Sequence, residues 1–513
     1  MWSGFGPWGK RGLPRHRRCP LRPRVPPSSH PAGKCAKIAL FEPCGSWTSL
    51  TSNSILILAA GEGTRMKSDL PKVLHSLAGK ALVEHVLDAV APLGGAVGIV
   101  LGRGAERVKE RLSGRKGLAF FIQKERRGSG DAVRPAARWL ASRGGSVLVL
   151  CGDAPLVRTE SLRALTRVHR REKNAATLLT AEVPDPAGYG RIRRGPDGRP
   201  AAIVEQRDAS VEEQSIREIN SGTYCFRIRD LLEGLRRLRP NNAKGEYYLT
   251  DVIGFLVGRS RSVGALRLSD GDEILGVNNR RELAEAGRRI NGRLLDRLMD
   301  AGVTVVDPAT TFVEESVRVG RDTVIEPQTF LAGATRIGRN CRIGPMTRLQ
   351  DCVVADGVRL EASFGEGARV ESGARVGPFS RLRPGAVIGR DAHVGNFVEI
   401  KKTRLGAGAK VNHLSYLGDA TVGPQVNVGA GVITCNYDGV QKHRTVIGRG
   451  AFIGSNVNLV APLRVGAGAV VGAGSTLTRD VPAQALALER APAVVKRGWA
   501  KSKRTRKSSP SHG

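Results

Sequence analysis

Apolar residues change their spacing along the chain, and the changes divide it into parts. From residue 54 to about 280, runs that are apolar at nearly every position alternate with segments of helical spacing such as 80–93 and 130–143. The apolar runs include "SILILAA" (54–60), "AVGIVLG" (96–102) and "SVLVLCGD" (146–153). Such runs are typical of strands buried on both faces, as in a mostly parallel sheet with crossover helices. We therefore predict an α/β domain over 54–280.

The segment "RELAEAGRRINGRLLDRLMDAGV" (281–303) has a different pattern. Its apolar residues Leu283, Ile290, Leu294, Leu298 and Met299 recur at the spacing of one helix face. We predict a single helix here that connects two domains.

After this helix the apolar period is six. Neither a helix nor an alternating strand has that period, whereas a prism of short parallel strands does, with one hexapeptide on each side and small residues at the corners. Three hexapeptides form one coil of 18 residues, so 319–477 predicts about nine stacked coils. We expect a left-handed parallel β-helix over 304–482, followed by an arm and basic tail over 483–513. The guide residues are Val319, Ile325, Leu331, Ile337, Ile343 and Leu349, then Val370, Val376, Leu382, Ile388, Val394 and Ile400, and finally Ile447, Ile453, Leu459, Val465, Val471 and Leu477.

The net charge of +34 over 513 residues is distributed unevenly. The two ends, 1–53 and 495–513, are rich in Lys and Arg, and prolines in the first segment prevent a continuous amphipathic helix. We expect residues 1–53 to form a disordered basic extension, with the fold beginning near Leu50. The remaining positive charge suits anionic small substrates as readily as nucleic acid. No recognition helix or aromatic–basic stacking platform supports the nucleic-acid alternative.

The eight cysteines are scattered and form no Cys-x-x-Cys pair or Cys/His cluster. This favours reduced thiols in a cytosol over disulfides or a metal centre. No stretch approaches 18 apolar residues, so we expect no membrane-spanning helix.

The loop "GEGTRM" (61–66) follows the first apolar run directly. It lacks the third glycine of a dinucleotide fingerprint and the Gly-Lys-Ser/Thr of a P-loop. Its backbone N–H groups, together with Arg65 and Lys72, suit a polyphosphate. Taken alone, the same residues are equally compatible with a glycine-rich turn carrying solvated cations.

Longer motifs distinguish these alternatives. "LAAGEGTRMKSDLPKVLHSLAGK" (58–80) resembles the opening of bacterial sugar-nucleotide pyrophosphorylases, and further matches are "CGDAPL" (151–156), "GYGRI" (188–192), "VEQRDA" (204–209), "EINSGTY" (218–224), "NNAKGEYYLTD" (241–251) and "GVNNR" (276–280). Together with the hexapeptide prism, they resemble the family of bacterial bifunctional enzymes that combine N-acetylglucosamine-1-phosphate uridyltransferase with glucosamine-1-phosphate N-acetyltransferase. The resemblance covers about 54–500 and implies a cytoplasmic bacterial enzyme that supplies precursors of peptidoglycan and lipopolysaccharide.

For the N-terminal domain, the resemblance implies a Rossmann-like nucleotidyltransferase acting on UTP with Mg²⁺. Arg65 and Lys72 would neutralise the phosphates, and Asp153 and Asn278 would bind the metal. Two departures affect only details of affinity: Cys151 stands where the family usually has Tyr, and "RRGSGDA" (126–132) replaces a Leu-Gly-Thr-containing segment, although Ser129 keeps the hydroxyl. The implied UTP and UDP-N-acetylglucosamine residues are Leu58, Ala59, Ala60, Gly61, Lys72, Gln123, Gly128, Ser129, Cys151, Gly152, Asp153, Gly190, Glu205, Asn220 and Asn278.

For the C-terminal domain, the resemblance implies acetyl transfer from acetyl-CoA in a homotrimer, with His413 as the proton acceptor and Glu399 as its orienting partner. Arg383 and Lys401 are separated by one full coil of the repeat, so they should stack on one face as a cationic clamp for the sugar phosphate. A slip in the period should place His413 off that face, where neighbouring subunits meet, and the loop 435–444 breaks the period as a functional insertion would. The implied sugar-phosphate residues are Arg383, Lys401, Tyr416, Asn427 and Asn436, and the implied acetyl-CoA residues are Ala430, Asn436, Tyr437, Ser455, Ala473 and Arg490.

One further alternative is a related pyrophosphorylase that uses another nucleotide or sugar, with its prism serving only as a scaffold. The presence of His413, Tyr416 and "CNYDG" (435–439) argues against this reading.

Overall fold

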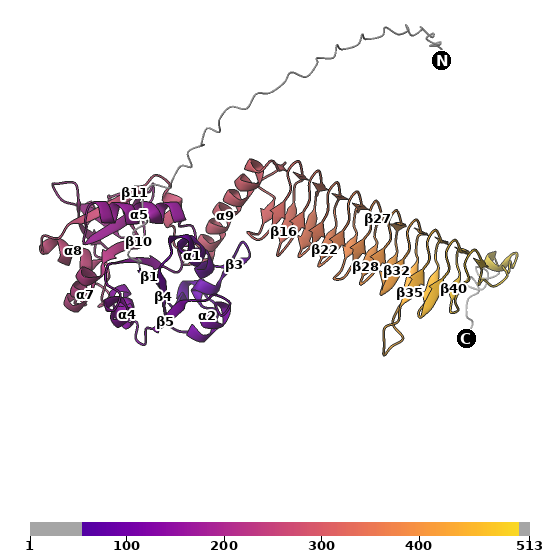
Figure 1. Ribbon diagram of the computed structural model, residues 1–513, viewed down its shortest axis with the longest axis horizontal. Helices are drawn as coiled ribbons and strands as arrows, with labels where there is room; N and C mark the ends of the chain where they lie inside the picture. The colour runs from indigo at the N-terminus through magenta and orange to yellow at the C-terminus, as the bar shows by residue number, and fades with distance from the viewer. Residues whose placement is uncertain (1–53, 502–513) are drawn as a thin grey trace, which may run out of the picture. The chain divides into compact units, whose positions relative to one another are not determined.

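The computed structural model describes residues 54–501, so the basic extension and the end of the basic tail lie outside the described residues (Figure 1). The N-terminal domain is built on a mixed sheet with strand order β11-β7-β10-β6-β1-β4-β5. All pairs along this order are parallel except those of β10, which runs antiparallel to β6 and β7. The strands are β1 (Ser54–Ala59), β4 (Ala96–Leu101), β5 (Leu118–Ile122), β6 (Ser146–Cys151), β7 (Ala176–Glu182), β10 (Glu218–Arg227) and β11 (Val263–Leu268), with β8 (Arg191–Arg194) and β9 (Pro200–Val204) paired at the side.

The sheet is buried on both faces, as the uninterrupted apolar runs predict. Leu56, Val100 and Val149 belong to one hydrophobic cluster, whereas Ile57 and Ile99 belong to another. The helices are α1 (Leu82–Val90), α2 (Ala105–Arg111), α3 (Ser129–Val133), α4 (Ala137–Ala141), α5 (Thr159–Arg171), α6 (Val211–Gln214), α7 (Ile228–Arg237) and α8 (Asp251–Gly258).

The helix expected over 130–143 is interrupted. A 3₁₀ turn over Arg134–Ala136 separates α3 from α4. Pro135 lies in this turn, and because proline lacks an N–H and crowds the preceding turn, it breaks a regular α-helix.

The connecting helix is α9 (Arg280–Asp300). The side chain of Asn279 caps it by accepting hydrogen bonds from the backbone N–H groups of Arg281 and Glu282, at 2.9 and 3.0 Å. Ile290 and Leu294 pack in a cluster with Leu82 of α1, while Leu298 joins the core of the β-helix. The predicted helix is confirmed, and its apolar face is shared between the two folds.

The C-terminal region is a prism of three parallel sheets, the left-handed β-helix expected from the period of six. The first face runs β12 (Thr304–Val305), β15 (Val324–Ile325), β18 (Arg342–Ile343), β21 (Arg359–Leu360), β24 (Arg375–Val376), β27 (His393–Asn396), β30 (Lys410–His413), β33 (Asn427–Val428), β36 (Phe452–Ile453), β39 (Val470–Val471) and β41 (Leu486–Ala487). The described strands thus extend past both ends of the 319–477 repeat.

The other two faces follow the same order. The second runs β13 (Phe312–Val313), β16 (Thr329–Ala332), β19 (Thr347–Gln350), β22 (Phe364–Glu366), β25 (Arg381–Leu382), β28 (Glu399–Lys401), β31 (Tyr416–Gly418), β34 (Ile433–Cys435), β37 (Asn458–Val460) and β40 (Thr476–Leu477). The third runs β14 (Arg318–Val319), β17 (Arg336–Ile337), β20 (Val353–Val354), β23 (Arg369–Val370), β26 (Val387–Ile388), β29 (Arg404–Leu405), β32 (Ala420–Val422), β35 (Thr445–Ile447) and β38 (Leu463–Val465).

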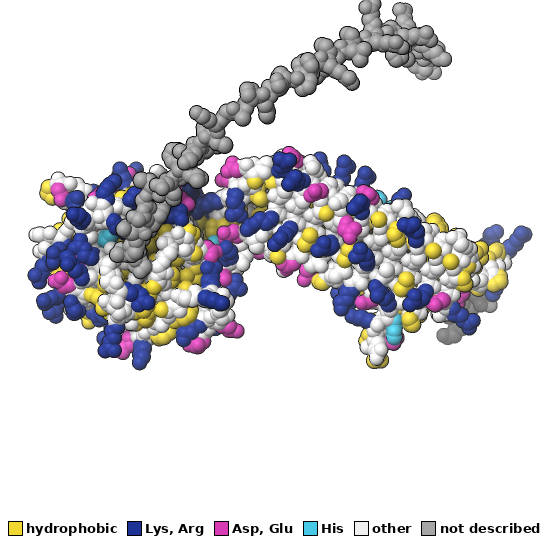
Figure 2. Space-filling view, in the orientation of Figure 1, with side chains coloured by type: hydrophobic (Ala, Val, Ile, Leu, Met, Phe, Trp, Pro, Cys, Tyr) yellow, Lys and Arg dark blue, Asp and Glu magenta, His cyan; other side chains and the backbone are white. Residues whose placement is uncertain are grey.

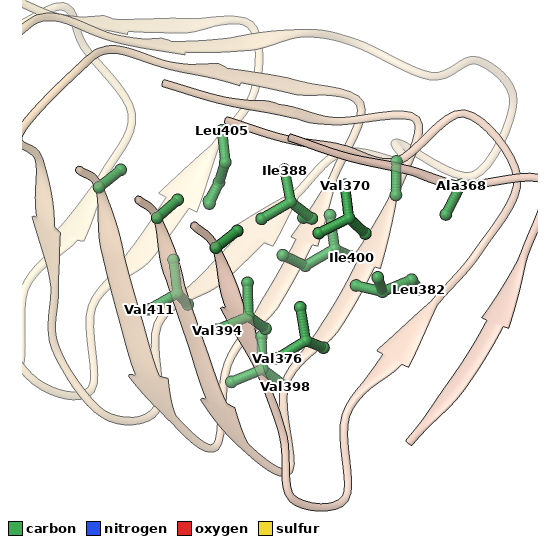
Figure 3. Packing of buried hydrophobic residues seen from close by; sticks show 14 of the residues in the cluster. Ala368, Val370, Val376, Leu382, Ile388, Val394, Val398, Ile400, Leu405 and Val411 are labelled. Carbon is green, nitrogen blue, oxygen red and sulfur yellow. The ribbon is translucent and has the colours of Figure 1, made fainter. Parts of the chain in front are cut away.

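The guide residues point into the prism, where they stack on their counterparts in adjacent coils (Figure 3). Val319, on the third face, is only partly buried, whereas the other predicted guide residues are buried. The pairing also explains the phase shifts in the sequence: Leu349 pairs with Gly365 and Ile388 with Leu405, so these coils are slightly shorter than three full hexapeptides. Between β34 and β35, the hairpin 435–444 projects from the prism (Figure 1).

Shortening a side chain inside the β-helix core should lower the stability of the β-helix. Ile343 is fully buried, so Ile343→Ala should cost roughly 2–5 kcal/mol and lower the urea midpoint of the β-helix transition followed by circular dichroism. Val353 is 38% exposed on the third face, so Val353→Ala should shift that midpoint little. Equal shifts for the two variants would contradict the inward assignment of the guide positions.

Candidate functional sites

Two segments expected to hold the nucleotide meet at the carboxyl edge of the N-terminal sheet. Leu58 in β1 pairs with Cys151 in β6, and the Gly152 N–H donates to the Leu58 carbonyl at 2.9 Å. A Cβ atom on Gly152 would lie 3.1 Å from Cβ of Ala59, so only glycine allows this approach without a shift. The loop that begins at Ala60 and Gly61 is therefore held beside Asp153.

Lys72, Asp153 and Asn278 converge at this edge from three distant parts of the sequence. The Lys72 ammonium forms an ion pair with the Asp153 carboxylate and donates to Oδ1 of Asn278 at 3.1 Å. Glu282 fixes Asn278 by accepting from its backbone N–H at 2.7 Å and its side-chain amide at 3.0 Å. Two oxygens thus converge on one cationic group, so Asp153 and Asn278 fit a hard cation such as Mg²⁺, which prefers oxygen ligands and takes few from protein.

The glycine loop continues into a short 3₁₀ helix, Thr64–Met66, that exposes Arg65. Gly63 and Lys67, on either side of this turn, have φ values of 66° and 48°. The Arg280 guanidinium donates to the Met66 carbonyl at 3.3 Å, which links the loop to the first turn of α9. The loop therefore presents Arg65 to solvent on a tethered backbone.

The expected sugar residues also assemble. The Gly190 carbonyl accepts from the Asn220 N–H at 2.8 Å, and a Cβ atom on Gly190 would lie 3.6 Å from Oε2 of Glu205. Asn220 donates from its side-chain amide to the Tyr224 hydroxyl at 2.7 Å. Burial raises the pKa of Glu205, although Thr250 donates to this carboxyl group at 3.2 Å. Gly190, Glu205 and Asn220 thus form a cluster of hydrogen-bonding groups suited to the hydroxyls of a sugar.

Gln123, Gly128 and Ser129 form another group at the edge of the sheet. Gln123 donates to the Gly128 carbonyl at 3.3 Å and to Asp131 at 3.1 Å. The Ser129 hydroxyl accepts from the Leu249 N–H at 3.0 Å, which leaves its own proton available to a ligand. Gly128 has a φ of 104°, which favours glycine.

Cys151, the departure from Tyr, has a thiol that approaches the Gly222 carbonyl, with a sulfur–oxygen distance of 3.7 Å. Burial raises the pKa of this thiol to about 12, so it is protonated at neutral pH and is a poor nucleophile. Its short side chain leaves a different surface from the one that tyrosine would provide.

In the β-helix, His413 and three expected acetyl-CoA residues occupy one column. Val411, Val428, Ile453 and Val471 are register partners on the first face. Two positions after each of these residues, and after Val394 in the preceding coil, the corner carries one residue per coil, which we call the corner column: Asn396, His413, Ala430, Ser455 and Ala473. Beyond it, Arg490 lies near Gly474, whose added Cβ would be 3.7 Å from Cδ of Arg490.

The partner of His413 is Asn396, not Glu399 as the sequence suggested. Nδ1 of His413 lies 2.8 Å from Oδ1 of Asn396, its register partner. Glu399 instead accepts from Arg383 at 2.9 Å, because it lies on the second face whereas His413 ends a strand of the first. An amide oxygen only accepts, so Nδ1 carries the proton and the exposed imidazole keeps Nε2 free to accept another.

Arg383 and Lys401, the residues of the expected clamp, lie at equivalent positions of adjacent coils, and a third cation lies near Lys401. Arg383 follows β25 and Lys401 ends β28, and the Arg383 N–H donates to the intervening Ile400 carbonyl at 2.8 Å. Lys442 of the 435–444 hairpin lies close enough that its ammonium, followed by burial and Arg383, lowers the pKa of Lys401. Excess positive charge of this kind suits a phosphate. Among the charged side chains on the visible surface, Lys and Arg are more widespread than Asp and Glu (Figure 2).

Two other expected residues, Tyr416 and Asn436, lie around Gly418, the register partner of Lys401. A Cβ atom on Gly418 would be 2.9 Å from Nδ2 of Asn436 and closer still to the Tyr416 hydroxyl, so Tyr416 and Asn436 share one surface. Asn436 is buried and donates to Asp419 at 2.5 Å. Asn427 lies apart on the first face, in register with Lys410, and the exposed Tyr437 is on the hairpin.

Comparison with known proteins agrees with this arrangement. The family models "MobA-like NTP transferase domain" and "Bacterial transferase hexapeptide (six repeats)" match residues 55–239 and residues 367–402 and 444–479, respectively. The "Bifunctional protein GlmU" of Trichlorobacter lovleyi is 48% identical over 88% of this chain and 99% of its own length. Those of Pelotomaculum thermopropionicum and Heliobacterium modesticaldum are 51% and 50% identical, over 88% and 86% of this chain and 99% and 97% of their own lengths.

The chain belongs to the GlmU family of bifunctional proteins.

Among solved structures, a UDP-glucose pyrophosphorylase complexed with UDP-glucose matches 47% of this chain and 99% of that chain. The sequence identity is 18% and the TM-score is 0.39, a likeness too low to establish a shared fold. In residues 54–501, no helix is long and apolar enough to cross a membrane. The same residues contain no group of three or more His, Cys, Asp or Glu side chains arranged to hold a metal.

In this GlmU family member, sequence reasoning missed two residues of the second site. Lys442 could have been noticed, because it lies in the insertion that breaks the period of six. Asn396 is separated from His413 by a shortened coil, which a strict repeat of six does not reveal.

Proposed function

We propose that this chain carries out two consecutive steps of UDP-N-acetylglucosamine synthesis. The β-helix acetylates glucosamine 1-phosphate with acetyl-CoA, and the N-terminal domain then transfers UMP from UTP to the acetylated sugar phosphate and releases pyrophosphate. The observation that carries the proposal is the corner column, in which His413 is aligned with small residues, together with the three cations Arg383, Lys401 and Lys442. A pyrophosphorylase whose prism served only as a scaffold would need neither feature.

In the N-terminal step, a phosphate oxygen of the sugar attacks the α-phosphorus of UTP, and pyrophosphate leaves. Such a reaction depends on positioning and on charge neutralisation more than on covalent participation of the protein. Arg65 and Lys72 supply fixed positive charge, and Gly190, Glu205 and Asn220 orient the sugar. Mg²⁺, held by Asp153 and Asn278, would supply further neutralisation of phosphate charge. Their convergence on one ammonium supports this assignment.

In the C-terminal step, the substrate amine arrives protonated. Nε2 of His413 takes one proton from the ammonium, and the free amine attacks the thioester carbonyl to form the C–N bond. As the C–S bond breaks, the nitrogen loses a second proton and the departing thiolate takes up a proton, so that the products are the amide and CoA thiol. Asn396 holds the tautomer that leaves Nε2 available. Arg383, Lys401 and Lys442 bind the phosphate of the sugar, while Ala430, Ser455 and Ala473 leave space for CoA along the corner column.

The proposed assembly is a homotrimer, and an apolar ridge beside the corner column supports it. The ridge consists of Met346, Phe379, Phe397 and Leu414, which are 51–61% exposed and all have positive φ values. Phe379 and Phe397 stack with ring centroids 5.4 Å apart. A left-handed conformation costs roughly 1–2 kcal/mol at such residues.

In the coils that follow His413, the same corner carries no large apolar side chain. There the left-handed positions are filled by Gly431, Asn456 and Gly474, residue types that adopt this conformation readily. Large apolar side chains are therefore retained only in the lower coils, which a neighbouring subunit would cover. The ridge ends at Leu414, next to His413, so the neighbour would border the acetyl-transfer site.

We place the enzyme in the bacterial cytoplasm, where UTP and acetyl-CoA are available. The described cysteines, Cys151, Cys225, Cys341, Cys352 and Cys435, are free thiols, in agreement with a reducing compartment.

The two activities should be separable by Asp153→Ala. This change removes one proposed metal ligand and the ion pair to Lys72, so uridylyl transfer measured by pyrophosphate release should be lost. Acetyl transfer, measured as free thiol from acetyl-CoA, should remain. Loss of both activities in a correctly folded variant would contradict the two-site proposal.

The general base should be identified by His413→Ala. Acetyl transfer should fall by about 10²–10⁴-fold, the usual effect of losing a positioned base. Raising the pH should partly restore the rate because more of the substrate amine is then already neutral. Uridylyl transfer serves as the internal control, and near-normal acetyl transfer at neutral pH would remove His413 from this role.

The ridge should govern assembly. The double variant Phe379→Asp/Phe397→Asp should reduce the mass measured by light scattering from three times 54.8 kDa toward that of one chain, because buried unpaired charges oppose association. It should also reduce acetyl transfer while sparing uridylyl transfer. Val353→Asp, which alters an exposed apolar residue of the third face, is the control. An unchanged mass for the double variant would exclude the ridge as the subunit contact.

A further inference from the structure

A hollow on the second face of the β-helix adjoins the phosphate clamp but contains residues that the proposed reaction does not use. Its volume is about 450 Å³, and we call it the arginine trough. The backbone of β19, β22 and β25 forms its floor. One wall is the column Arg348, Phe364 and Arg381, and the other is the column Gln350, Glu366 and Arg383. The lining residues are Arg348, Gln350, Phe364, Gly365, Glu366, Arg381, Leu382 and Arg383.

One wall of the trough places an aromatic ring between two arginines. Phe364 pairs in register with Arg348 on one side and Arg381 on the other. Because adjacent coils are about 4.8 Å apart, the two arginine backbones are separated by roughly 10 Å. The Phe364 side chain is 59% exposed, and both arginines are exposed. A flat apolar surface is thus flanked by two guanidinium groups.

The positive charge of this wall is not neutralised locally. Within the described part of the chain, neither Arg348 nor Arg381 forms an ion pair. Glu399, the register neighbour of Arg381, pairs with Arg383 instead, and Glu366 is the one acidic residue lining the trough. Three arginines and one glutamate therefore surround the hollow.

This composition fits a sugar phosphate. The C–H face of a pyranose ring packs on an exposed aromatic ring, and guanidinium groups bind phosphate by bidentate hydrogen bonds. Arg383 belongs both to the trough and to the clamp, so the hollow leads directly to the proposed position of the substrate phosphate. Clusters of like charge also attract oppositely charged substrates and increase their local concentration.

We propose that the arginine trough is a capture subsite for the sugar phosphate, which binds there before it moves to Arg383, Lys401 and Lys442. Arg348 and Arg381 attract the phosphate, and Phe364 supports the sugar ring. This inference rests on the proposed acetyl transfer but assigns additional residues to substrate delivery. None of the implied acetyl-CoA residues lines the trough.

The test removes the two unpaired charges in the full-length chain with Arg348→Gln/Arg381→Gln. Steady-state acetyl transfer is measured with glucosamine 1-phosphate at about 0.05 M and about 0.5 M salt, because high salt screens exposed charges. At low salt, KM for glucosamine 1-phosphate should rise about 3–10-fold while kcat is unchanged. At high salt the variant and the unmodified chain should agree within about twofold. KM for acetyl-CoA should not change.

The third face offers a matched control. There Val353 pairs in register with Arg336 and Arg369, so Arg336→Gln/Arg369→Gln removes two arginines around an exposed apolar residue at the same spacing. This control changes the net charge equally, away from the clamp, and should leave KM at both salt concentrations unchanged. Equal effects of the two double variants would assign the result to overall charge and overturn the subsite.

Phe364→Ala tests the ring separately. It should raise KM for glucosamine 1-phosphate by a similar factor at both salt concentrations, because the contact it removes is uncharged. Light scattering is performed on every variant: an altered mass for Arg348→Gln/Arg381→Gln would assign the arginines to subunit contact and overturn the proposal. Absence of acetyl transfer by the unmodified chain would instead refute the proposed function. Activity in that chain, with no change of KM in the trough variants, would refute only the subsite.

Discussion

The inward stacking of one aliphatic residue per hexapeptide is the interaction on which the acetyltransferase half depends. It fixes each coil at a spacing of about 4.8 Å from the next and aligns the outward side chains into columns. His413, Ala430, Ser455 and Ala473 come from different coils, yet they form one column because Val411, Val428, Ile453 and Val471 stack beneath the same face. The site is therefore a consequence of core register, with little need for contacts between its own side chains.

The sequence contained enough information to predict this register but not every contact. A repeat of six determines which residues point inward and which stack, so the alignment of Arg383 with Lys401 followed from their spacing. The pairing of His413 with Asn396 depends on a coil shortened to 17 residues, which a repeat of six does not predict. Glu399 was linked to the histidine only through the family resemblance, whereas in the structure Glu399 accepts a hydrogen bond from Arg383.

The N-terminal site was less accessible to reasoning from periodicity. Alternation of strands and helices predicted a parallel sheet and located the loop after β1, but it left the function of "GEGTRM" undecided. Lys72, Asp153 and Asn278 converge because three separate strand-end loops meet at one edge, and only the family resemblance had linked them beforehand. The antiparallel strand β10 has no distinctive apolar pattern, which explains why its direction was not anticipated.

The two sites manage positive charge in different ways, and the difference follows from their folds. At the sheet edge, Asp153 neutralises Lys72 in a nearly buried ion pair. An anion or a metal ion that binds there has to displace this ion pair or join it. On the prism, side chains of successive coils are held parallel, and the Arg383 guanidinium pairs with Glu399 of the next coil. Lys401 and Lys442 lie close enough for the Lys442 ammonium to lower the pKa of Lys401, although the Asp419 carboxylate acts in the opposite direction. A rigid solenoid can therefore hold like charges close together at little conformational cost, because the backbone core, and not the charged residues, determines the spacing.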